Sequence, residues 1–230
     1  MKLAFWSRRL HKWLGLLVGI QALLWMASGV YMTAVSIDFI HGDHLSHVER
    51  PPLDAGRVAV QPAQLAAQFP SMTSFRLKRL QERDVYEVKH PAGVSLVDAG
   101  TGQRLDPLDE TGARSLALEA YQGEGNLKEI RLLHQLPQEV ASRKGPLWRA
   151  DFDDEFGSAL YISPSTGEVV AKRHTMWRVF DFLWMLHIMD YDTRSDVNNS
   201  LLRAASAAGV LFALSGLWLL WFTVRRRTAS

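Results

Sequence analysis

Residues 14–37 read LGLLVGIQALLWMASGVYMTAVSI, a run of 24 residues without a formally charged side chain. Only Gln21, Ser28, Thr33 and Ser36 interrupt its apolar character. At about 1.5 Å of rise per helical residue, the run reaches roughly 36 Å, which is enough to cross the hydrocarbon layer of a bilayer. A buried core helix is rarely so long and so free of charge, so the run predicts a transmembrane helix.

A second run of this kind lies near the other end of the chain. Residues 204–224 are 21 uncharged residues, followed directly by the arginines at positions 225–227. We therefore predict a second transmembrane helix over residues 200–224. We expect the first helix to be a retained signal anchor, since its apolar stretch is too long for a cleavable signal peptide.

The charges of the chain are segregated. The sequence has 230 residues with 26 basic and 24 acidic side chains, and all the acidic ones lie between Asp38 and Asp196. Residues 38–199 carry a net charge of −6, whereas the two ends carry +8. The positive-inside rule therefore predicts a bacterial inner-membrane protein with both ends in the cytoplasm and residues 38–199 in the periplasm. The negative charge of the middle segment argues against nucleic acid as a partner. The expected partner of the two apolar segments is the lipid bilayer.

The sequence contains no cysteine. This excludes disulfides, thiolate metal sites, iron–sulfur clusters and c-type haem attachment. It also contains no glycine-rich phosphate loop after a strand, so we see no NAD or flavin site. Neither a Ser–His nor a His–carboxylate arrangement is visible, and we predict no hydrolase site.

The middle of the chain contains an internal repeat. SLVDAGTGQRL at residues 95–105 aligns with LYISPSTGEVV at residues 160–170, an offset of 65. Each copy has a Thr-Gly turn between strands, and each follows another alternating strand, at residues 84–89 and 147–152. A helix is expected before each hairpin, over residues 61–68 and 111–121. The fold class is therefore α+β, with two tandem helix-plus-antiparallel-hairpin modules between the two transmembrane helices.

Several short motifs carry a resemblance to a known family. They are Arg9-Leu-His-Lys-Trp-Leu-Gly15, Trp25-Met-Ala-Ser-Gly29, Gly42-Asp-His-Leu45, the two Thr-Gly turns and Phe182-Leu-Trp-Met-Leu-His-Ile-Met-Asp-Tyr191. In their order and membrane placement they resemble PepSY-associated transmembrane proteins, and the repeated unit resembles the PepSY module. The resemblance spans nearly the whole chain.

The expected organisation follows from the two spans and the repeat. It comprises a cytoplasmic N-terminus, the first span, a periplasmic connector, two PepSY-like repeats, an interfacial amphipathic segment, the second span and a cytoplasmic tail. These correspond to residues 1–13, 14–37, 38–56, 57–109, 110–174, 175–199, 200–224 and 225–230.

The resemblance also implies a chemistry. Larger members of this group, with four spans, resemble inner-membrane haem-containing reductases that release iron from siderophores. This chain has two spans and no hydride-accepting site, so its electron donor would be another membrane protein or a quinol. At most, it would be the electron-transfer component of a membrane reductase.

Three histidines at the membrane boundaries are candidate haem b ligands. His11, His44 and His187 fall within the family-like motifs, and a low-spin haem needs two imidazoles. Residues 175–199 predict an interfacial helix whose apolar face presents His187 among aromatic residues, at Trp177, Phe180 and Trp184. The simpler alternatives are an interfacial polar residue for His11 and an incidental histidine in an aromatic belt for His187.

The thickness of the bilayer restricts the pairing of these ligands. His11 and His187 belong to opposite faces, roughly 30 Å apart, so they cannot bind one iron. His44 with His187 can, since both lie at the periplasmic boundary. His11 would need a second His11, and a homodimer through the small-residue pairs Gly15/Gly19 and Ala205/Gly209 would supply it as a four-helix bundle.

A metal site is a further hypothesis. His41, His44 and His47 recur every three residues beside Asp43, and imidazoles with a carboxylate suit zinc, copper or iron. One tight site requires the helix to end near Gly42, and a solvated turn is the alternative. A second acidic cluster lies at a predicted hairpin tip and comprises Asp151, Asp153, Asp154 and Glu155. It is either a solvated turn or an element that binds a cation or a partner.

Two functions from different classes remain. The first is a haem b-binding electron-transfer subunit that serves periplasmic reduction, for example of a ferric siderophore. The second is a non-catalytic membrane anchor whose PepSY modules bind or regulate a periplasmic partner protein. Histidines beside aromatic residues at both membrane faces favour the first, and the lack of a donor domain favours the second.

Overall fold

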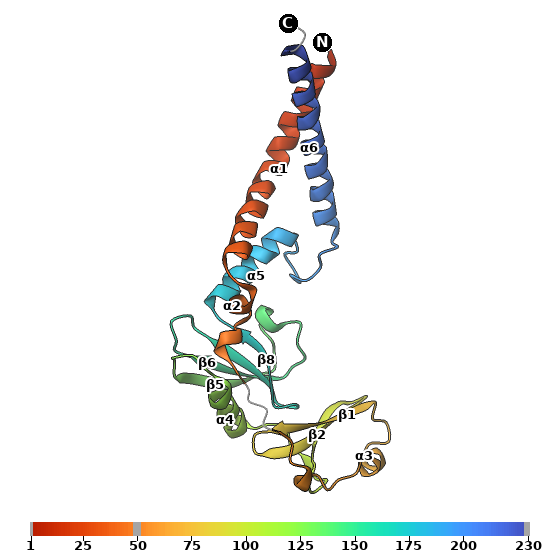
Figure 1. Cartoon of the computed structure of the whole chain (residues 1–230), viewed down its shortest axis with the longest axis vertical. Helices are drawn as coiled ribbons and strands as arrows, with labels where there is room; N and C mark the ends of the chain where they lie inside the picture. Colours follow the sequence, from red (N-terminus) through yellow and green to blue (C-terminus); the bar gives the residue numbers. More distant parts are fainter. Residues whose placement is uncertain (1, 48–51, 228–230) are drawn as a thin grey trace. The chain divides into compact units, whose positions relative to one another are not determined.

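A computed structural model describes residues 2–47 and 52–227, shown in Figure 1. Residues 1, 48–51 and 228–230 lie outside it, and with them the middle of the predicted connector and the outermost parts of both predicted cytoplasmic ends. The chain divides into two compact units. One, the membrane unit, comprises residues 1–37 and 179–230, and the other, the distal unit, comprises residues 38–178.

The membrane unit is built on two long helices that pack side by side, α1 (Lys2–Ala34) and α6 (Ser200–Arg227). Their stretches Phe5–Ala34 and Ser200–Trp221 are long and apolar enough to cross a membrane, and most of their large apolar side chains are exposed. Such surfaces are stable only against lipid. The predicted pair of membrane helices is thus confirmed, although α1 begins before residue 14 and ends short of residue 37.

Small residues admit close packing between these helices. A side chain at Gly15 would meet Phe212 at 3.0 Å, and one at Gly209 would lie 3.9 Å from Trp25. Both glycines therefore lie where α1 and α6 approach each other. A side chain at Gly19 would meet no atom of the described chain within 4 Å. The small-residue pair of α1 thus contributes only Gly15 to this contact.

The distal unit contains two antiparallel sheets of the same topology, as predicted from the repeat. The first has the order β1 (Ser74–Leu80), β2 (Arg83–His90), β3 (Gly93–Asp98), β4 (Arg104–Leu105), and follows α3 (Pro62–Gln68). The second has the order β5 (Leu127–Leu133), β6 (Leu147–Phe152), β7 (Ala159–Ser163), β8 (Glu168–Arg173), and follows α4 (Glu110–Ala120).

Each helix covers one face of its sheet. In the first repeat Leu65 of α3 and Phe69, which directly follows the helix, join a core with Val88 and Val97. In the second, α4 contacts β5, β6 and β7 and buries Leu116 in its own core. Figure 1 shows α4 beside β5. The first strand of each sheet, β1 and β5, was not predicted, so the modules have one strand more than expected. The α+β fold class is confirmed.

The Thr-Gly turns have a clear steric reason. Gly102 and Gly167 both have left-handed backbone conformations, with φ of 76° and 63°. Residues with a Cβ are strained in this conformation, whereas glycine is not. A side chain at Gly167 would also collide with Leu80 of the first repeat, 2.5 Å away. The second turn is therefore a contact between the repeats, and Lys78 reinforces it by donating a hydrogen bond to the carbonyl of Thr166 at 2.6 Å.

The connecting elements are short. They are α2 (Ile37–His41) and the 3₁₀ helices η1 (Asp43–Leu45), η2 (Ala55–Arg57) and η3 (Gln138–Val140). The remaining helix is α5 (Thr175–Ile188), which begins in the distal unit and ends in the membrane unit. The amphipathic segment predicted over residues 175–199 is therefore a helix followed by an irregular loop.

The predicted acidic hairpin tip is an ordered turn between β6 and β7. Asp154 accepts hydrogen bonds from the hydroxyl of Tyr121 at 2.8 Å and from the backbone N–H of Ser158 at 2.7 Å. Burial, together with the hydrogen bond to Asp154, raises the pKa of Tyr121 to about 12. Asp151 pairs with Arg149 on β6 at 2.8 Å. These two carboxylates therefore have structural partners within the chain.

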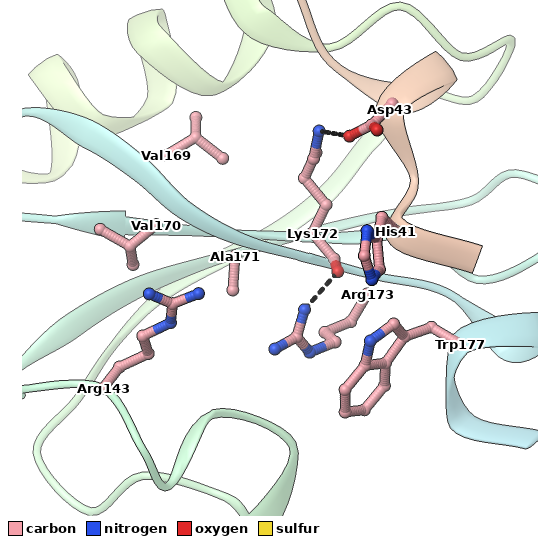
Figure 2. A pocket seen from close by; sticks show the side chains of 9 residues that line it. All are labelled: His41, Asp43, Arg143, Val169, Val170, Ala171, Lys172, Arg173 and Trp177. Carbon is pink, nitrogen blue, oxygen red and sulfur yellow. Dashed lines mark hydrogen bonds and ion pairs between the residues drawn. The ribbon is translucent and has the colours of Figure 1, made fainter. Parts of the chain in front are cut away.

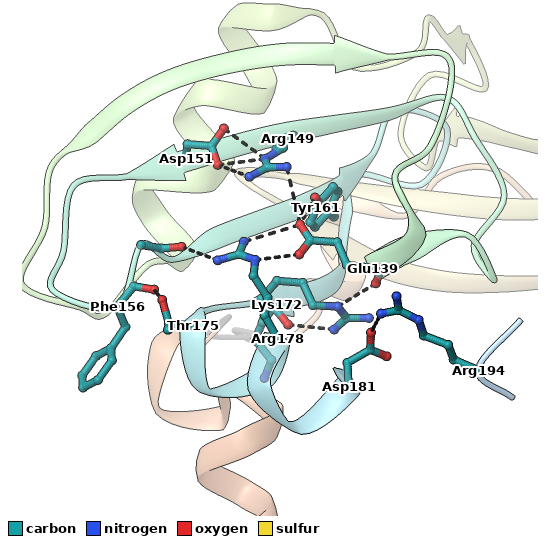
Figure 3. Close-up of polar contacts among 12 residues, drawn as sticks. Glu139, Arg149, Asp151, Phe156, Tyr161, Lys172, Thr175, Arg178, Asp181 and Arg194 are labelled. Carbon is teal, nitrogen blue, oxygen red and sulfur yellow. Dashed lines mark hydrogen bonds and ion pairs between the residues drawn. The ribbon is translucent and has the colours of Figure 1, made fainter. Parts of the chain in front are cut away.

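An ionic cluster ties the start of α5 to the second sheet (Figure 3). The Glu139 carboxylate accepts a hydrogen bond from Nε of Arg178 at 2.8 Å and one from the hydroxyl of Tyr161, and Arg149 lies 3.5 Å away. Burial alone would raise the pKa of Glu139, but these hydrogen bonds and charges lower it below its usual value. Glu139 is therefore ionised at neutral pH and holds two arginines.

His174 is a buried structural histidine between the end of β8 and α2. Its side chain is fully buried, and Nε2 lies 3.0 and 3.2 Å from the carbonyl oxygens of Phe39 and Ile40. Carbonyls only accept, so Nε2 carries the proton, while buried Nδ1 has no hydrogen-bond partner among the described residues. Burial lowers the pKa of His174 despite these hydrogen bonds.

This environment predicts a pH-dependent stability of the distal unit. Because the folded pKa is below the unfolded value, the contribution of His174 is complete above about pH 6.5 and is lost as the pH falls. The free energy of unfolding should decrease by at most about 1.4 kcal/mol per pH unit below that point. Thermal unfolding between pH 7.5 and 5.5 measures this. The dependence of the free energy of unfolding on pH should become weaker in His174→Gln. It should stay unchanged in the control His134→Gln, which replaces an exposed histidine.

Candidate cofactor site

The end of α5 is fixed inside the membrane unit by side chains from α1. The last carbonyls of any helix lack partners within the helix, and in an apolar environment each must find one. Gln21 donates a hydrogen bond to the carbonyl of Leu186 at 3.0 Å, and Trp25 Nε1 donates to that of His187 at 2.7 Å. Gln21 and Trp25 are four residues apart, so they lie on one face of α1. These contacts explain why a glutamine interrupts the apolar run.

The same face of α1 holds the side chain of His187. Oγ of Ser28, a fully buried residue, lies 2.8 Å from Nδ1 of His187 and donates its single proton to the carbonyl of Leu24 at 2.7 Å or of Trp25 at 3.1 Å. With its proton on a carbonyl, we assign the hydroxyl oxygen as the acceptor of a hydrogen bond from Nδ1–H of His187. Nε2 of His187 consequently carries a lone pair, and it makes no hydrogen bond to any residue that the structure describes.

His11 has the same arrangement at the other end of the membrane unit. Its Nδ1 lies 2.7 Å from Oγ of Ser215, and this hydroxyl donates to the carbonyl of Phe212 at 2.7 Å. The imidazole stacks on Phe212, with 4.4 Å between ring centroids and 8° between planes. Nε2 of His11 is thus also left as the lone-pair nitrogen, without a hydrogen bond to the described residues.

Aromatic rings line the approach to His187 along α5. Phe180 and Trp184 stack with centroids 6.1 Å apart, and Trp184 and His187 with centroids 6.3 Å apart. The predicted shared face of these three residues is confirmed. Trp177, which was predicted on the same face, lies against the guanidinium of Arg173 at 3.8 Å. Both His11 and His187 are half-buried.

The turn after α5 depends on Asp190. Its carboxylate accepts backbone N–H groups from Asp192, Thr193, Ser195 and Asp196 at 3.0–3.2 Å, and the Thr193 hydroxyl as well. The hydroxyl, together with these N–H groups, lowers the pKa of Asp190, which keeps it ionised. The carboxylate therefore fixes the chain directly behind His187.

The remaining candidate ligands lie in the distal unit. The exposed imidazole of His44 stacks on Phe39 with 4.4 Å between centroids, and its ring lies 5.7 Å from that of His174. His44 and His187 belong to separate units, and their pairing on one haem stays a prediction. The helix α2 does end at His41, next to Gly42 with its left-handed φ of 70°.

The predicted metal set is not assembled. Within residues 2–47 and 52–227, no three side chains of His, Asp or Glu come close enough together to hold a metal ion. The structure thus does not gather His41, His44 and His47 around one point. Asp43, which was expected to complete the set, pairs with Lys172 at 2.7 Å instead. The metal site stays a prediction.

Sequence reasoning missed the residues that support the histidines. Ser28 and Ser215 are separated from their histidines by 159 and 204 residues, so no local pattern relates them. Trp25 and Ser28 do lie within one family-like motif and His187 within another. The polar residues inside an apolar run were the available signal, because a polar group at that depth needs a partner.

The close packing around His11 leads to a further prediction. A side chain at Gly216 would lie 3.1 Å from Cε1 of His11, so Gly216→Val should displace the imidazole from Ser215. Gly29→Val, where a side chain would meet no described atom within 4 Å and which belongs to neither small-residue pair, should not. Gly216→Val is therefore expected to bind haem at the His11 level about ten-fold less tightly than the parent chain does. Haem titration measures this, and equal effects of both variants would argue against it.

The comparisons with known proteins agree with this architecture. No curated protein and no solved structure matches the chain. Residues 8–230 match the family described as the PepSY-associated TM region, which covers both membrane helices, both sheets and all the family-like motifs. The chain therefore belongs to the PepSY-associated TM region family.

Proposed function

We propose that this chain is a haem b-binding electron-transfer subunit of the bacterial inner membrane that reduces an acceptor in the periplasm. The observation that carries the proposal is the serine-supported histidine that occurs twice in the membrane unit. In both cases we assign the serine oxygen as the acceptor of a hydrogen bond from Nδ1–H, which leaves the lone pair on Nε2, the form of imidazole that ligates iron.

The surroundings of both histidines suit a haem. A ligating histidine normally has its second nitrogen held by a hydrogen bond, which fixes the ring and raises its basicity. Ser28 and Ser215 provide these bonds, and Phe212 and Trp184 provide flat apolar surfaces beside the imidazoles. A bound haem would supply one-electron chemistry. The chain's own residues would hold it, orient the ligands and exclude water.

The two histidines lie at separate levels of the membrane unit. His11 and Ser28 are 17 residues apart on α1, about 25 Å along a helix with 1.5 Å of rise per residue. Each level of one chain therefore provides one imidazole, and a low-spin haem needs two. His44 is the proposed second ligand at the His187 level, and a second copy of the chain would complete the His11 level.

The direction of electron flow rests on the charge distribution. The positive-inside rule favours cytoplasmic ends and a periplasmic distal unit, which places His187 on the periplasmic side. Electrons would then arrive from another membrane protein or a quinol and leave to a periplasmic acceptor, for which a ferric chelate is our candidate.

Reoxidation kinetics test this function. Purified protein loaded with haem is reduced with dithionite, freed of the excess and mixed with ferric citrate. The reduced absorption band should decay within seconds to minutes, and ferrous iron should form in equal amount. Reduced protein that is stable in ferric citrate would contradict the proposed acceptor. Protein that takes up no haem would contradict the proposal as a whole and favour the partner-binding anchor.

A further inference from the structure

The distal unit contains a cleft that no step of the proposed electron transfer uses (Figure 2). It has a volume of about 310 Å³, within the lower range of small-molecule sites. The strand β8 forms one wall with its apolar residues 169–171, and Arg143, Lys172, Arg173, His41 and Trp177 surround the rest. Asp43 is the one acidic residue among those that line it.

The charge of this cleft is positive. Its lining includes the basic residues Arg143, Lys172 and Arg173 and the acidic residue Asp43, which pairs with Lys172 at 2.7 Å. The guanidinium of Arg143 makes no hydrogen bond or ion pair with any residue that the structure describes. An arginine presents a fork of N–H donors that matches the oxygens of a phosphate. The lining residues therefore carry more positive than negative charge, and Arg143 has N–H groups available to bind an anion.

Arg173 is already held in position for such a ligand. Its Nε donates to the carbonyl of Glu139 at 2.8 Å, and one terminal nitrogen donates to the carbonyl of Lys172 at 2.7 Å. The guanidinium also lies over the ring of Trp177 at 3.8 Å, a favourable cation–π distance. A fixed arginine loses little freedom when it binds, which favours affinity.

The position of the cleft along the chain points to a source for the anion. His41 follows the last residue of α1 by only seven positions, which limits the connection to about 24 Å even when fully extended. Trp177 lies on α5, whose later residues belong to the membrane unit. The cleft is thus tethered within reach of a membrane surface, where phospholipid phosphates are concentrated and where tryptophan and arginine are favoured.

We propose that this cleft binds the phosphate of an anionic phospholipid headgroup. Arg143 and Arg173 would bind the phosphate oxygens, and the apolar residues of β8 and Trp177 would contact the glycerol portion. The binding is independent of haem, so it can be tested on protein with or without the cofactor.

Native mass spectrometry of the delipidated full chain, titrated with phosphatidylglycerol or phosphatidylcholine, tests the proposal. Arg143→Met is the test variant, and Lys144→Met is its control. Both residues are exposed neighbours with the same charge, but only Arg143 lines the cleft. Arg143→Met should weaken phosphatidylglycerol binding about ten-fold, as expected for the loss of a charged hydrogen bond. Lys144→Met should bind like the parent chain, and phosphatidylcholine should bind weakly to all three.

A second arm uses inorganic phosphate as competitor. Displacement of phosphatidylglycerol by millimolar phosphate in the parent chain, but not in Arg143→Met, supports a phosphate site in this cleft. Phosphate binding that depends on Arg143 without any preference for phosphatidylglycerol over phosphatidylcholine would overturn an anionic phospholipid as the source. Equal losses in both variants, or no loss in either, would overturn the site.

Discussion

His187→Ala is expected to remove the haem at the α5 level of the membrane unit. The substitution deletes the Nε2 lone pair that Ser28 orients and leaves that hydroxyl without its partner. If both levels are loaded in the parent chain, about two thirds of the haem should be lost, because the α5 level would hold one haem per chain and the His11 level, shared by two copies, half a haem per chain. The reduced absorption spectrum and the haem content per chain measure this.

Ser28→Ala separates orientation from ligation. The histidine remains, but its Nδ1 proton loses the acceptor that fixes the ring, so we expect haem affinity to fall about 10- to 100-fold with the band retained at saturation. His134→Ala is the matched control, since this exposed histidine of the distal unit is not among the proposed ligands. A spectrum unchanged in His187→Ala, or an equal loss in His134→Ala, would contradict the assignment of His187.

Glu139→Ala should cause the largest loss of stability in the distal unit. The Glu139 carboxylate is 13% exposed and neutralises Arg149 and Arg178, and it accepts the hydroxyl of Tyr161 as well. Removing this carboxylate leaves the positive charges of Arg149 and Arg178 close together without the negative charge that neutralises them. Breaking a buried ion pair in this way costs about 3 kcal/mol when one partner is partly exposed. The melting temperature should fall by about 10 °C.

A matched variant distinguishes this cluster from surface ion pairs. Glu129 pairs with Arg131 on β5, but both side chains are about half exposed, so Glu129→Ala should cost less than about 1 kcal/mol. Glu139→Gln should lie between the two, because an amide keeps one acceptor oxygen. Thermal unfolding followed by far-ultraviolet circular dichroism measures all three. A melting temperature that falls equally in the two alanine variants would show that the cluster has no special role.

The sequence predicted the parts of the fold that depend on local rules. A long uncharged run needs lipid, and a Thr-Gly pair between alternating strands needs a left-handed glycine, so both membrane helices and both hairpins were predicted correctly. The strands β1 and β5 were missed for a physical reason. Each lies at the edge of its sheet and is rich in charge, and the polar face of β1 is matched by Glu87 and Glu168 rather than by solvent.

The candidate site was less accessible to sequence reasoning. His11 and His187 were identified from their position at the membrane boundaries, but the serines, Gln21 and Trp25 that hold them are distant in sequence. Only the three-dimensional packing of α1 against α5 and α6 shows why these polar residues occur within apolar helices. No sequence motif indicates a role for His174, and the structure shows that it ties β8 to α2 through backbone carbonyls.

The measurement that tests the central proposal most directly is a reduced-minus-oxidised absorption spectrum of the detergent-purified chain, expressed with added haem precursor. The account predicts a sharp b-type band in the reduced protein, with the haem released intact by acid acetone because no cysteine can attach it covalently. A folded protein that remains colourless, with both membrane helices present and with haem supplied in excess, would contradict the proposed electron-transfer function.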